Sequence, residues 1–280
     1  MYEPHWGLHA AESRGGSEFF FAGPTHEESL ARMHYLVTGR RRVGLLVGES
    51  GTGKSRLLGR LADELLRPGC CVAQASLLGT GLRETLWTLA VGLGATPRRR
   101  DDLFVLWRRV TDRLREHRYQ QYHTVLLLDD ADEASADVLS HVVRLAQLDP
   151  SPEAGLTIIV ASRPDGLARL GSRLSELAEL RVELPAWDEQ ETAEYVAAAL
   201  SHAGRFESVL DDAGMQRLFQ LSGGVPRRVK QLLDLALMAG AGQQATRIGA
   251  EMVHAVYEEL SAIDLLSPTS GVTSGETIRV

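Results

Sequence analysis

Residues 48–55 read Gly-Glu-Ser-Gly-Thr-Gly-Lys-Ser, which matches the phosphate-loop pattern G-x-x-x-x-G-K-S/T at every fixed position. An apolar run at 43–47 precedes the pattern, and residues 56–62 after it have the apolar spacing of a helix. In such a strand–turn–helix unit, the backbone N–H groups of the turn point inward at phosphate oxygens, and the helix start adds positive charge. The competing interpretation is a glycine-rich turn that happens to precede a helix. The context favours a site for a nucleoside triphosphate.

The side chains of this stretch suit contacts with phosphate and with a metal ion. Lys54 is long enough to reach the β- and γ-phosphates of a nucleotide, and the hydroxyl of Ser55 suits Mg²⁺. We therefore predict a metal ligand at Ser55 and a catalytic role for Lys54. The predicted nucleotide-binding residues of the stretch are Gly48, Glu49, Ser50, Gly51, Thr52, Gly53, Lys54, Ser55 and Arg56.

Composition restricts the class of protein. The 280 residues carry a formal net charge of -7 and are 44% hydrophobic, which is typical of a soluble globular protein. A negative chain has no overall attraction to nucleic acid, so DNA binding would need a local basic patch. The compact candidates are Arg40–Arg42 and Arg98–Arg100, and solvated loop ends are the simpler interpretation of both.

Targeting and metal signals are lacking in the sequence. No apolar stretch approaches the roughly 18 residues of a membrane span, and no signal peptide is evident, which predicts a cytoplasmic location. The spacing of cysteines and histidines does not match a zinc site. Cys70 and Cys71 are neighbours in a predicted strand and point to opposite faces, so we expect no disulfide between them.

Strands and helices alternate along the first two thirds of the chain. Besides 43–47, we expect strands at 70–75, 124–128, 156–161 and 181–184, separated by helical patterns. Capping boxes at Thr25–Glu28 and Asp188–Glu191 predict two helix starts. After Pro185 every periodic segment is helical. This predicts a doubly wound α/β domain with a parallel five-stranded sheet, followed by a small all-helical lid domain.

The predicted domain borders follow these changes in pattern. We expect an irregular N-terminal segment at 1–24 near the nucleotide pocket, the nucleotide-binding α/β domain at 25–186 and the helical lid at 187–262. Residues 267–280 are rich in Ser, Thr and Gly without periodicity, so we expect a disordered tail at 263–280.

Two acidic residues follow the strand at 124–128. Asp129 is placed to bind the Mg²⁺ ion, and Asp130 is placed to orient and polarise an attacking water as the catalytic base. Helix capping or plain solvation would also explain two carboxylates at the end of a strand. Their position downstream of a phosphate loop favours the catalytic interpretation.

Three further residues are candidates for sensing the nucleotide. Ser162 closes the strand at 156–161, at the edge of the sheet where ligands of α/β proteins bind, although helix capping toward Pro164 would also explain it. Pro226 and Arg227 open a lid helix, from which Arg227 is expected to reach the nucleotide and act in catalysis. The alternative for Arg227 is a surface arginine on a helix face.

With these motifs in order, the chain resembles AAA+ ATPases of the P-loop NTPase class. More narrowly, it is similar to the general secretion pathway ATPases of the ExeA/GspA type and to the related transposition helper ATPases. The resemblance covers roughly residues 1–260 and rests on Met1-Tyr2 with Trp6-Gly7-Leu8, Gly48–Ser55, Leu126–Ala131, Leu184-Pro185 with Glu191-Thr192 and Tyr195, and Gly224–Arg227.

The resemblance implies properties that the motifs alone do not. It implies that the nucleotide is ATP, that Ser162 stands at the sensor 1 position and Arg227 at the sensor 2 position, and that the protein forms homo-oligomers. It also implies that Tyr2, Trp6 and Pro226 lie near the adenine.

The chain departs from this family at two places. The family has Asp-Glu-Ala-Gln after the third strand, whereas residues 129–132 here read Asp-Asp-Ala-Asp, so Asp130 is one methylene shorter than the expected Glu. The arginine finger of the family is replaced by Leu177, and Arg173 or Arg181 are the substitutes nearby. The membrane-spanning and periplasmic parts of the secretion ATPases are also absent from these residues.

Three functions compete on this basis. The leading prediction is a Mg²⁺-dependent ATPase whose cycle drives conformational change or assembly of a partner protein complex. The second is a nucleotide-dependent adaptor or switch with little turnover, which the short Asp130 and the missing arginine favour. The third is a DNA-associated transposition helper, which would need the arginine triplets to form a phosphate-binding stripe.

Overall fold

The computed structural model describes residues 3–8, 19–149, 151 and 154–265, and it divides into two compact units. Residues 22–187 form an α/β unit. The described residues before Ala22 and after Trp187 form a helical unit.

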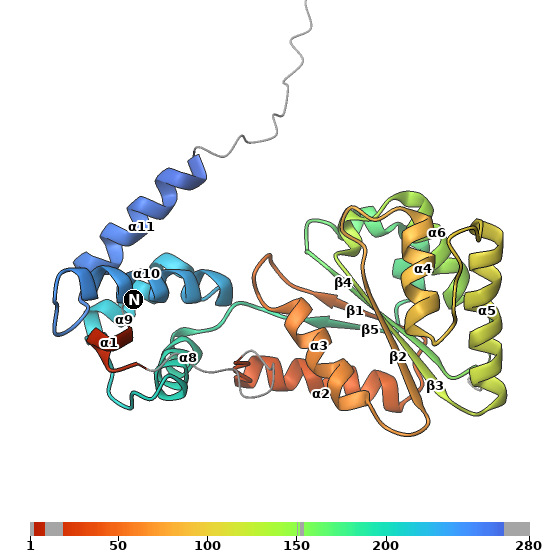
Figure 1. The fold of residues 1–280 in the computed structure, drawn as a ribbon, viewed down its shortest axis with the longest axis horizontal. Helices are drawn as coiled ribbons and strands as arrows, with labels where there is room; N and C mark the ends of the chain where they lie inside the picture. Colours follow the sequence, from red (N-terminus) through yellow and green to blue (C-terminus); the bar gives the residue numbers. More distant parts are fainter. Residues whose placement is uncertain (1–2, 9–18, 150, 152–153, 266–280) are drawn as a thin grey trace, which may run out of the picture. The chain divides into compact units, whose positions relative to one another are not determined.

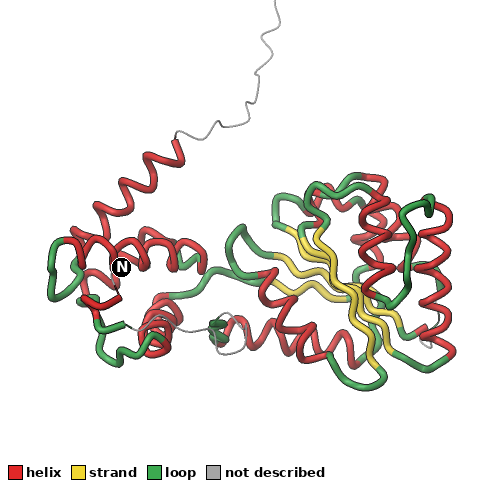
Figure 2. Tube along the Cα trace, in the orientation of Figure 1, coloured by secondary structure: helices red, strands yellow, loops and turns green. Residues whose placement is uncertain are grey.

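The α/β unit contains one sheet of five parallel strands, which Figure 2 shows in yellow. The spatial order is β2-β3-β4-β1-β5, so β4 lies between β1 and β3. The predicted parallel five-stranded sheet is confirmed, and most strand ends lie within one residue of the expected positions. The strands are β1 (Val43–Val47), β2 (Cys70–Ser76), β3 (His123–Asp129), β4 (Leu156–Ser162) and β5 (Leu180–Glu183).

Helices cover both faces of this sheet, which makes it doubly wound (Figure 1). Alternate strand residues explain the two layers, because neighbours in a strand point to opposite faces. Leu45 packs into the large core under the helices from α4 to α7, whereas Gly44 lies against Leu36 of α2. The helices are α2 (Pro24–Thr38), α3 (Lys54–Leu65), α4 (Leu82–Gly92), α5 (Leu103–Tyr119), α6 (Ala136–Ala146) and α7 (Ser172–Leu177).

The helix starts show which capping signals decide a boundary. The capping box of Asp188 and Glu191 is present as predicted. The box expected from Thr25 is wrong, because the cap is Gly23, two residues earlier, which makes no side-chain bond, and α2 begins at Pro24. Proline is favoured at the first position of a helix, since its ring fixes the backbone angle and it lacks an N–H that would need a partner. This preference sets the start of α2.

The helical unit holds four longer helices and one short one. They are α1 (Glu3–Trp6), α8 (Glu189–His202), α9 (Asp212–Ser222), α10 (Pro226–Gly242) and α11 (Ala250–Leu265). The predicted helical portion after Pro185 is therefore confirmed. The predicted tail, residues 263–280, lies outside the described residues from 266 on.

The N-terminal Trp6 is an anchor of the helical unit. Its side chain is 2% exposed, and its indole N–H donates to the carbonyl of Leu237 over 2.7 Å. A side chain at Gly240 would meet the indole at 2.7 Å, so glycine makes room for the ring on α10. Arg205 donates to the Trp6 carbonyl over 2.6 Å. The expected proximity of Trp6 to an adenine stays a prediction, and Tyr2 lies outside the described residues.

Candidate functional site

The phosphate loop follows β1 at the carboxyl edge of the sheet, as the motif predicts. Gly51 and Gly53 have positive φ angles of 87° and 101°, which glycine adopts readily, and Gly53 caps α3. At Gly48 a β-carbon would stand 2.6 Å from the Leu184 carbonyl and 2.7 Å from the Thr52 hydroxyl. The loop is thus a tight cradle of backbone in which a side chain at Gly48 does not fit.

Lys54 is the buried cation of the cradle. Lys54 is 8% exposed. Its ammonium donates to the carbonyl of Gly48 over 2.7 Å and to that of Glu49 over 3.0 Å. An ammonium has three N–H bonds, so among the described groups one remains for a phosphate oxygen. Burial lowers the pKa of Lys54 below its usual value, while the carboxylates of Asp129, Asp132 and Asp130 oppose that shift. A bound phosphate would add negative charge directly beside this buried cation and so stabilise its charged form.

Ser55 and Asp129, the two predicted metal ligands, are in contact. The Ser55 hydroxyl, on the first turn of α3, lies within hydrogen-bonding reach of the Asp129 carboxylate at the end of β3. Burial raises the pKa of Asp129, which is 5% exposed, and the Ser55 bond works against that rise. Both groups offer oxygen atoms, the donors that Mg²⁺ prefers, and a cation here would offset the cost of burying the carboxylate. These residues therefore fit a magnesium ion whose other ligands are phosphate and water.

Asp130, the predicted base, has an unusual backbone. Its φ of 53° lies in the left-handed region, and it caps the short 3-10 helix η1 (Ala131–Glu133). Its N–H donates to Asp129 over 2.9 Å, and its Oδ2 accepts from the Ser76 hydroxyl at the end of β2 over 3.2 Å. Non-glycine residues adopt this conformation at a small cost, tolerated where neighbouring bonds hold it. The carboxylate is held toward β2 in this structure.

Ser162 lies next to the phosphate loop but its hydroxyl is turned to its own chain. The side chain is 1% exposed and donates to the Arg163 carbonyl over 2.9 Å. The Ser162 carbonyl accepts from the Gly48 N–H over 3.2 Å, which joins the end of β4 to the start of the loop. The predicted role of Ser162 as a nucleotide sensor stays a prediction.

An ion pair links the turn after β3 to the loop after β4. Asp132 is 3% exposed, and its carboxylate accepts from the Arg163 side chain over 2.6 Å and from the Arg163 N–H over 3.2 Å. The guanidinium also pairs with Glu133. At Gly166 a β-carbon would meet that of Asp132 at 2.2 Å, so the two segments are closely fitted. The pair joins the backbone that carries Asp130 to the backbone that carries Ser162.

Pro226 and Arg227 belong to the helical unit, where they are the first two residues of α10. Two glycines with positive φ, Gly223 at 60° and Gly224 at 68°, precede them and turn the chain from α9 into α10. Arg227 is exposed. Its predicted action on a nucleotide stays a prediction.

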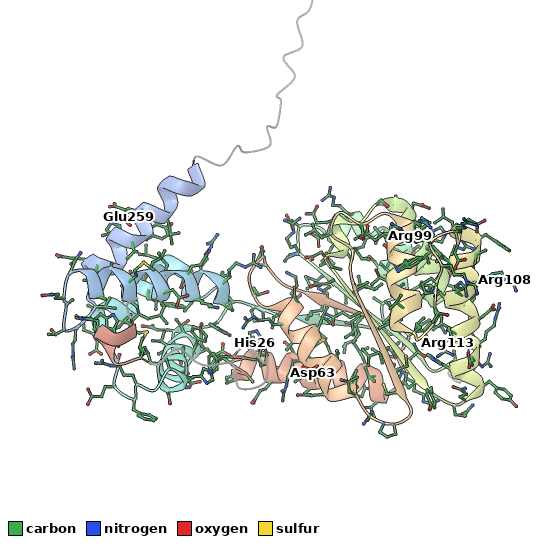
Figure 3. The ribbon with its side chains drawn as sticks, viewed as in Figure 1. His26, Asp63, Arg99, Arg108, Arg113 and Glu259 are labelled. Atoms are coloured by element: carbon green, nitrogen blue, oxygen red, sulfur yellow. The ribbon has the colours of Figure 1, made fainter. Side chains whose placement is uncertain are left out.

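The arginines proposed as substitutes for the arginine finger, Arg173 and Arg181, lie at the surface beside acidic residues. Arg173 pairs with Glu176 over 3.5 Å, and Arg181 pairs with Glu183 over 3.0 Å, both exposed. Arg41 pairs with Glu179 at the amino edge of the sheet, opposite the phosphate loop. Arg99 lies in the loop before α5, and Arg108 and Arg113 lie on α5 itself. Figure 3 labels all three.

Sequence reasoning missed four residues of this site, which are Ser76, His26, Asp132 and Arg163. Ser76 ends β2 beside β3, and a polar residue at the end of a strand next to the acidic one was a usable signal. Asp132 stood out only as a departure from a family pattern. His26 and Arg163 carry no local pattern, because their partners come from distant parts of the chain.

The comparisons with known proteins agree with this geometry. Residues 37–170 match the family model described as AAA domain, a range that runs from the end of α2 through η3 (Leu167–Leu170) and includes β1, β3 and β4.

The chain is also 25% identical over 252 residues to the general secretion pathway protein A of Aeromonas hydrophila, covering 88% of this chain. It spans about half, 46%, of the length of that curated relative. The predicted resemblance to AAA+ proteins of the ExeA/GspA type is therefore confirmed.

Solved structures with the same fold include proteins from other processes. The Cdc6p protein of Pyrobaculum aerophilum matches with a TM-score of 0.69 and 18% identity over 91% of this chain and 73% of its own. The Aeropyrum pernix Orc1 protein in complex with DNA matches with 0.64 and 18% over 89% and 68%. The Holliday junction branch migration motor RuvB of Thermotoga maritima matches with 0.55 and 20% over 85% and 70%. At these identities the likeness shows the fold alone, and it confirms the predicted P-loop NTPase architecture.

No helix among the described residues is both long and apolar enough to cross a membrane.

Proposed function

We propose that the chain is a Mg²⁺-dependent ATPase that couples its nucleotide cycle to conformational change or assembly in a partner protein complex. One observation carries the proposal: the Ser55 hydroxyl of the phosphate loop lies within hydrogen-bonding reach of Asp129 at the end of β3. This contact joins a phosphate cradle to a buried carboxylate, the two parts that nucleotide hydrolysis requires. The AAA domain at 37–170 contains both.

The proposed roles follow from the positions of the side chains. Lys54 binds the phosphates, and Ser55 with Asp129 holds Mg²⁺, which neutralises the charge that develops on the phosphate oxygens. Asp130, next in the chain, orients the attacking water. Ser162 at the end of β4 and Arg227 at the start of α10 sense the nucleotide, and Pro226 lines the adenine site. We also propose that the chain forms homo-oligomers, that it acts on a partner protein complex and that it is located in the cytoplasm.

The experiment that tests this function separates binding from turnover. Asp130→Asn keeps the shape of the side chain and removes its charge, so it should bind ATP as the parent does and lose at least about 10²-fold in phosphate release. Asp165→Asn is the matched control, since Asp165 is 76% exposed and lies in the loop after β4. Equal turnover in the parent and in Asp130→Asn would overturn the assignment of the base.

A nucleotide-dependent switch with little turnover is the second candidate function. The left-handed backbone of Asp130 and its bond to Ser76 support it, because both hold the short carboxylate toward β2. Phosphate release at several protein concentrations distinguishes the two candidates. Turnover that rises per molecule with concentration indicates an oligomeric ATPase, and ATP binding with negligible turnover at every concentration indicates a switch.

A DNA-associated helper is the weakest of the proposed functions. It would use Arg40–Arg42 or Arg98–Arg100, and in the first triplet Arg41 is already paired with Glu179. Titration with duplex DNA at low and moderate salt tests it, because phosphate contacts weaken steeply as salt rises. An affinity that is negligible at both salt concentrations removes this candidate.

A further inference from the structure

His26 is a buried histidine that contacts the phosphate loop from outside. It lies near the start of α2, where Figure 3 labels it, and only 3% of it is exposed. Its Nε2 is 3.1 Å from the carbonyl oxygen of Thr52, and its Nδ1 is 3.2 Å from the indole Nε1 of Trp187. Both ring nitrogens therefore have a partner within the α/β unit.

The chemistry of the partners fixes the form of the ring. An indole N–H is only a donor, so Nδ1 of His26 must be the acceptor in the bond from Trp187. Nδ1 therefore carries no proton, and Nε2 carries the proton that is donated to the Thr52 carbonyl. The ring is neutral, and its two hydrogen bonds run in one direction, from Trp187 toward the phosphate loop.

The carbonyl that His26 holds belongs to a peptide that faces the phosphate. A trans peptide unit directs its C=O and its N–H to opposite sides. When His26 holds the Thr52 carbonyl on the outside of the loop, the N–H of Gly53 in the same peptide points to the inside, where phosphate binds. Gly53 must be glycine beside this ring, because its β-carbon would lie 2.9 Å from Nε2.

Trp187 ends the α/β unit. It is 5% exposed, and the next residue, Asp188, caps α8, the first long helix of the helical unit. The chain thus leaves the α/β unit at Trp187. Trp187 is hydrogen-bonded to His26, which in turn bonds to the phosphate loop at Thr52.

We propose that His26 is a positioning residue that fixes the Gly53 N–H for phosphate and reports occupancy of the loop to Trp187. The inference rests on the proposed binding of ATP. The donors form one chain, in which Trp187 donates to His26, His26 donates to Thr52, and the Gly53 N–H donates to the β-phosphate. Hydrogen bonds in such a chain polarise and strengthen one another. A phosphate at the inner end therefore strengthens the bond at Trp187.

The direct test is the indole N–H resonance of Trp187 in an NMR titration of the full chain with ADP, assigned with Trp187→Phe. We expect the Trp187 proton to move downfield as ADP saturates the site, and adenosine, which lacks phosphate, to leave it unchanged. Trp107 on α5 is the internal control, because its ring packs on Arg144 and His141 away from the loop. An unmoved Trp187 resonance in a chain that binds ADP overturns the relay and leaves the proposed function standing.

Two substitutions at His26 separate its two bonds. In His26→Asn the amide oxygen replaces Nδ1 and keeps the bond from Trp187, whereas in His26→Gln the amide nitrogen replaces Nε2 and keeps the bond to Thr52. We expect the dissociation constant for ADP, measured by calorimetry, to rise about tenfold in His26→Asn and only about twofold in His26→Gln. Parental affinity in His26→Asn overturns the positioning role.

A substitution on the other partner keeps the test decisive if a His26 variant fails to fold. Trp187→Phe preserves most of the packing and removes the donor, and we expect the dissociation constant to rise about twofold, with no change in Trp107→Phe. Equal affinities in these two variants contradict the relay. Failure of the parent chain to bind ADP in the same calorimeter would instead refute the proposed function itself.

Discussion

The phosphate loop, residues 48–55, and the acidic turn, residues 129–133, lie at the same edge of one sheet but are held in place differently. Lys54 and Thr52 bond to carbonyls of Gly48 and Glu49 within their own stretch. The turn instead depends on Ser76, 54 residues from Asp130 in the chain, and on Arg163, 31 residues from Asp132. The side-chain bonds of Lys54 and Thr52 are thus local, although His26 and the Ser162 carbonyl each add one contact to the loop from outside, whereas the turn takes its shape only after β2, β3 and β4 have paired.

This difference predicts different consequences of substitution. Changes to loop side chains should alter nucleotide binding while the fold remains, because the side-chain bonds of Lys54 and Thr52 stay within residues 48–55. Changes to the turn should alter stability and turnover together, since its contacts join separate strands.

The largest effect is expected at Lys54. Lys54→Ala removes the buried cation of the cradle, and with it charge-assisted bonds to phosphate, so ATP affinity measured by calorimetry should fall at least about 100-fold. Thermal stability should change little. Lys230, the other lysine of the sequence, lies on α10 and provides the control variant Lys230→Ala. A Lys54→Ala chain that binds ATP as the parent does would contradict the proposed site.

The next effect is expected at Asp132, in the acidic turn. Asp132→Ala leaves the Arg163 guanidinium without its buried partner, and we expect a loss of about 2 kcal/mol in the free energy of unfolding, because Arg163 is partly exposed. Phosphate release should fall as well, since the turn carries Asp130. Asp165→Ala removes an exposed carboxylate 3.8 Å from the same guanidinium and is the control. Equal stability in Asp132→Ala and Asp165→Ala would contradict the claim that contacts with distant residues hold the acidic turn in place.

Acid should weaken the same ion pair. Burial raises the pKa of Asp132, but the bonds from Arg163 outweigh it and leave the pKa below its usual value. A carboxyl with a depressed pKa stabilises the fold above its unfolded value of 3.8 and loses that contribution as the pH falls below it. The stability difference between the parent and Asp132→Ala, measured in urea, should therefore shrink below pH 3.8.

A smaller effect is expected at Ser76. Ser76→Ala removes the donor that holds Asp130 toward β2. We expect the rate of phosphate release to change by about two- to fivefold, the worth of one hydrogen bond, while ATP affinity stays constant. Thr80→Ala, in the loop after β2, serves as the control. A rise in rate favours a holding role for Ser76, a fall favours an orienting role, and an unchanged rate shows that Ser76 does not act on Asp130.

The smallest effect is expected at His123, and it is an effect on stability. His123 lies at the opposite end of β3 from Asp129. Burial lowers the pKa of His123 to about 4 from 6.5, and its ring bonds to Thr157 over 3.0 Å. Because the unfolded chain binds a proton below 6.5 and the folded chain does not, stability should fall as the pH drops from 6.5 toward 4. In His123→Asn this fall should be smaller by about 1 kcal/mol, allowing for the exposed part of the ring. A parallel pH dependence in both chains would contradict the assignment.

The comparison between the phosphate loop and the acidic turn also explains which features could be predicted from the sequence. The phosphate loop, the strand ending at Asp129 and the five-stranded sheet follow from local patterns, namely motif spacing and continuous apolar runs. The contacts of Asp130 with Ser76 and of His26 with Trp187 do not, because they depend on the order of strands and on the exit of the chain from the sheet. The start of α2 was missed by two residues, because the cap is Gly23 with Pro24 as the first helical residue, and not Thr25.

The most direct measurement of the central claim is the affinity for ATP with Mg²⁺ and with EDTA, in the parent and in Asp129→Asn. We propose that Ser55 and Asp129 together bind the metal that accompanies the nucleotide. The parent should therefore bind ATP at least about tenfold more tightly with Mg²⁺ than without it, and Asp129→Asn should bind with the same low affinity in both conditions. An equal dependence on Mg²⁺ in the two chains would contradict the account.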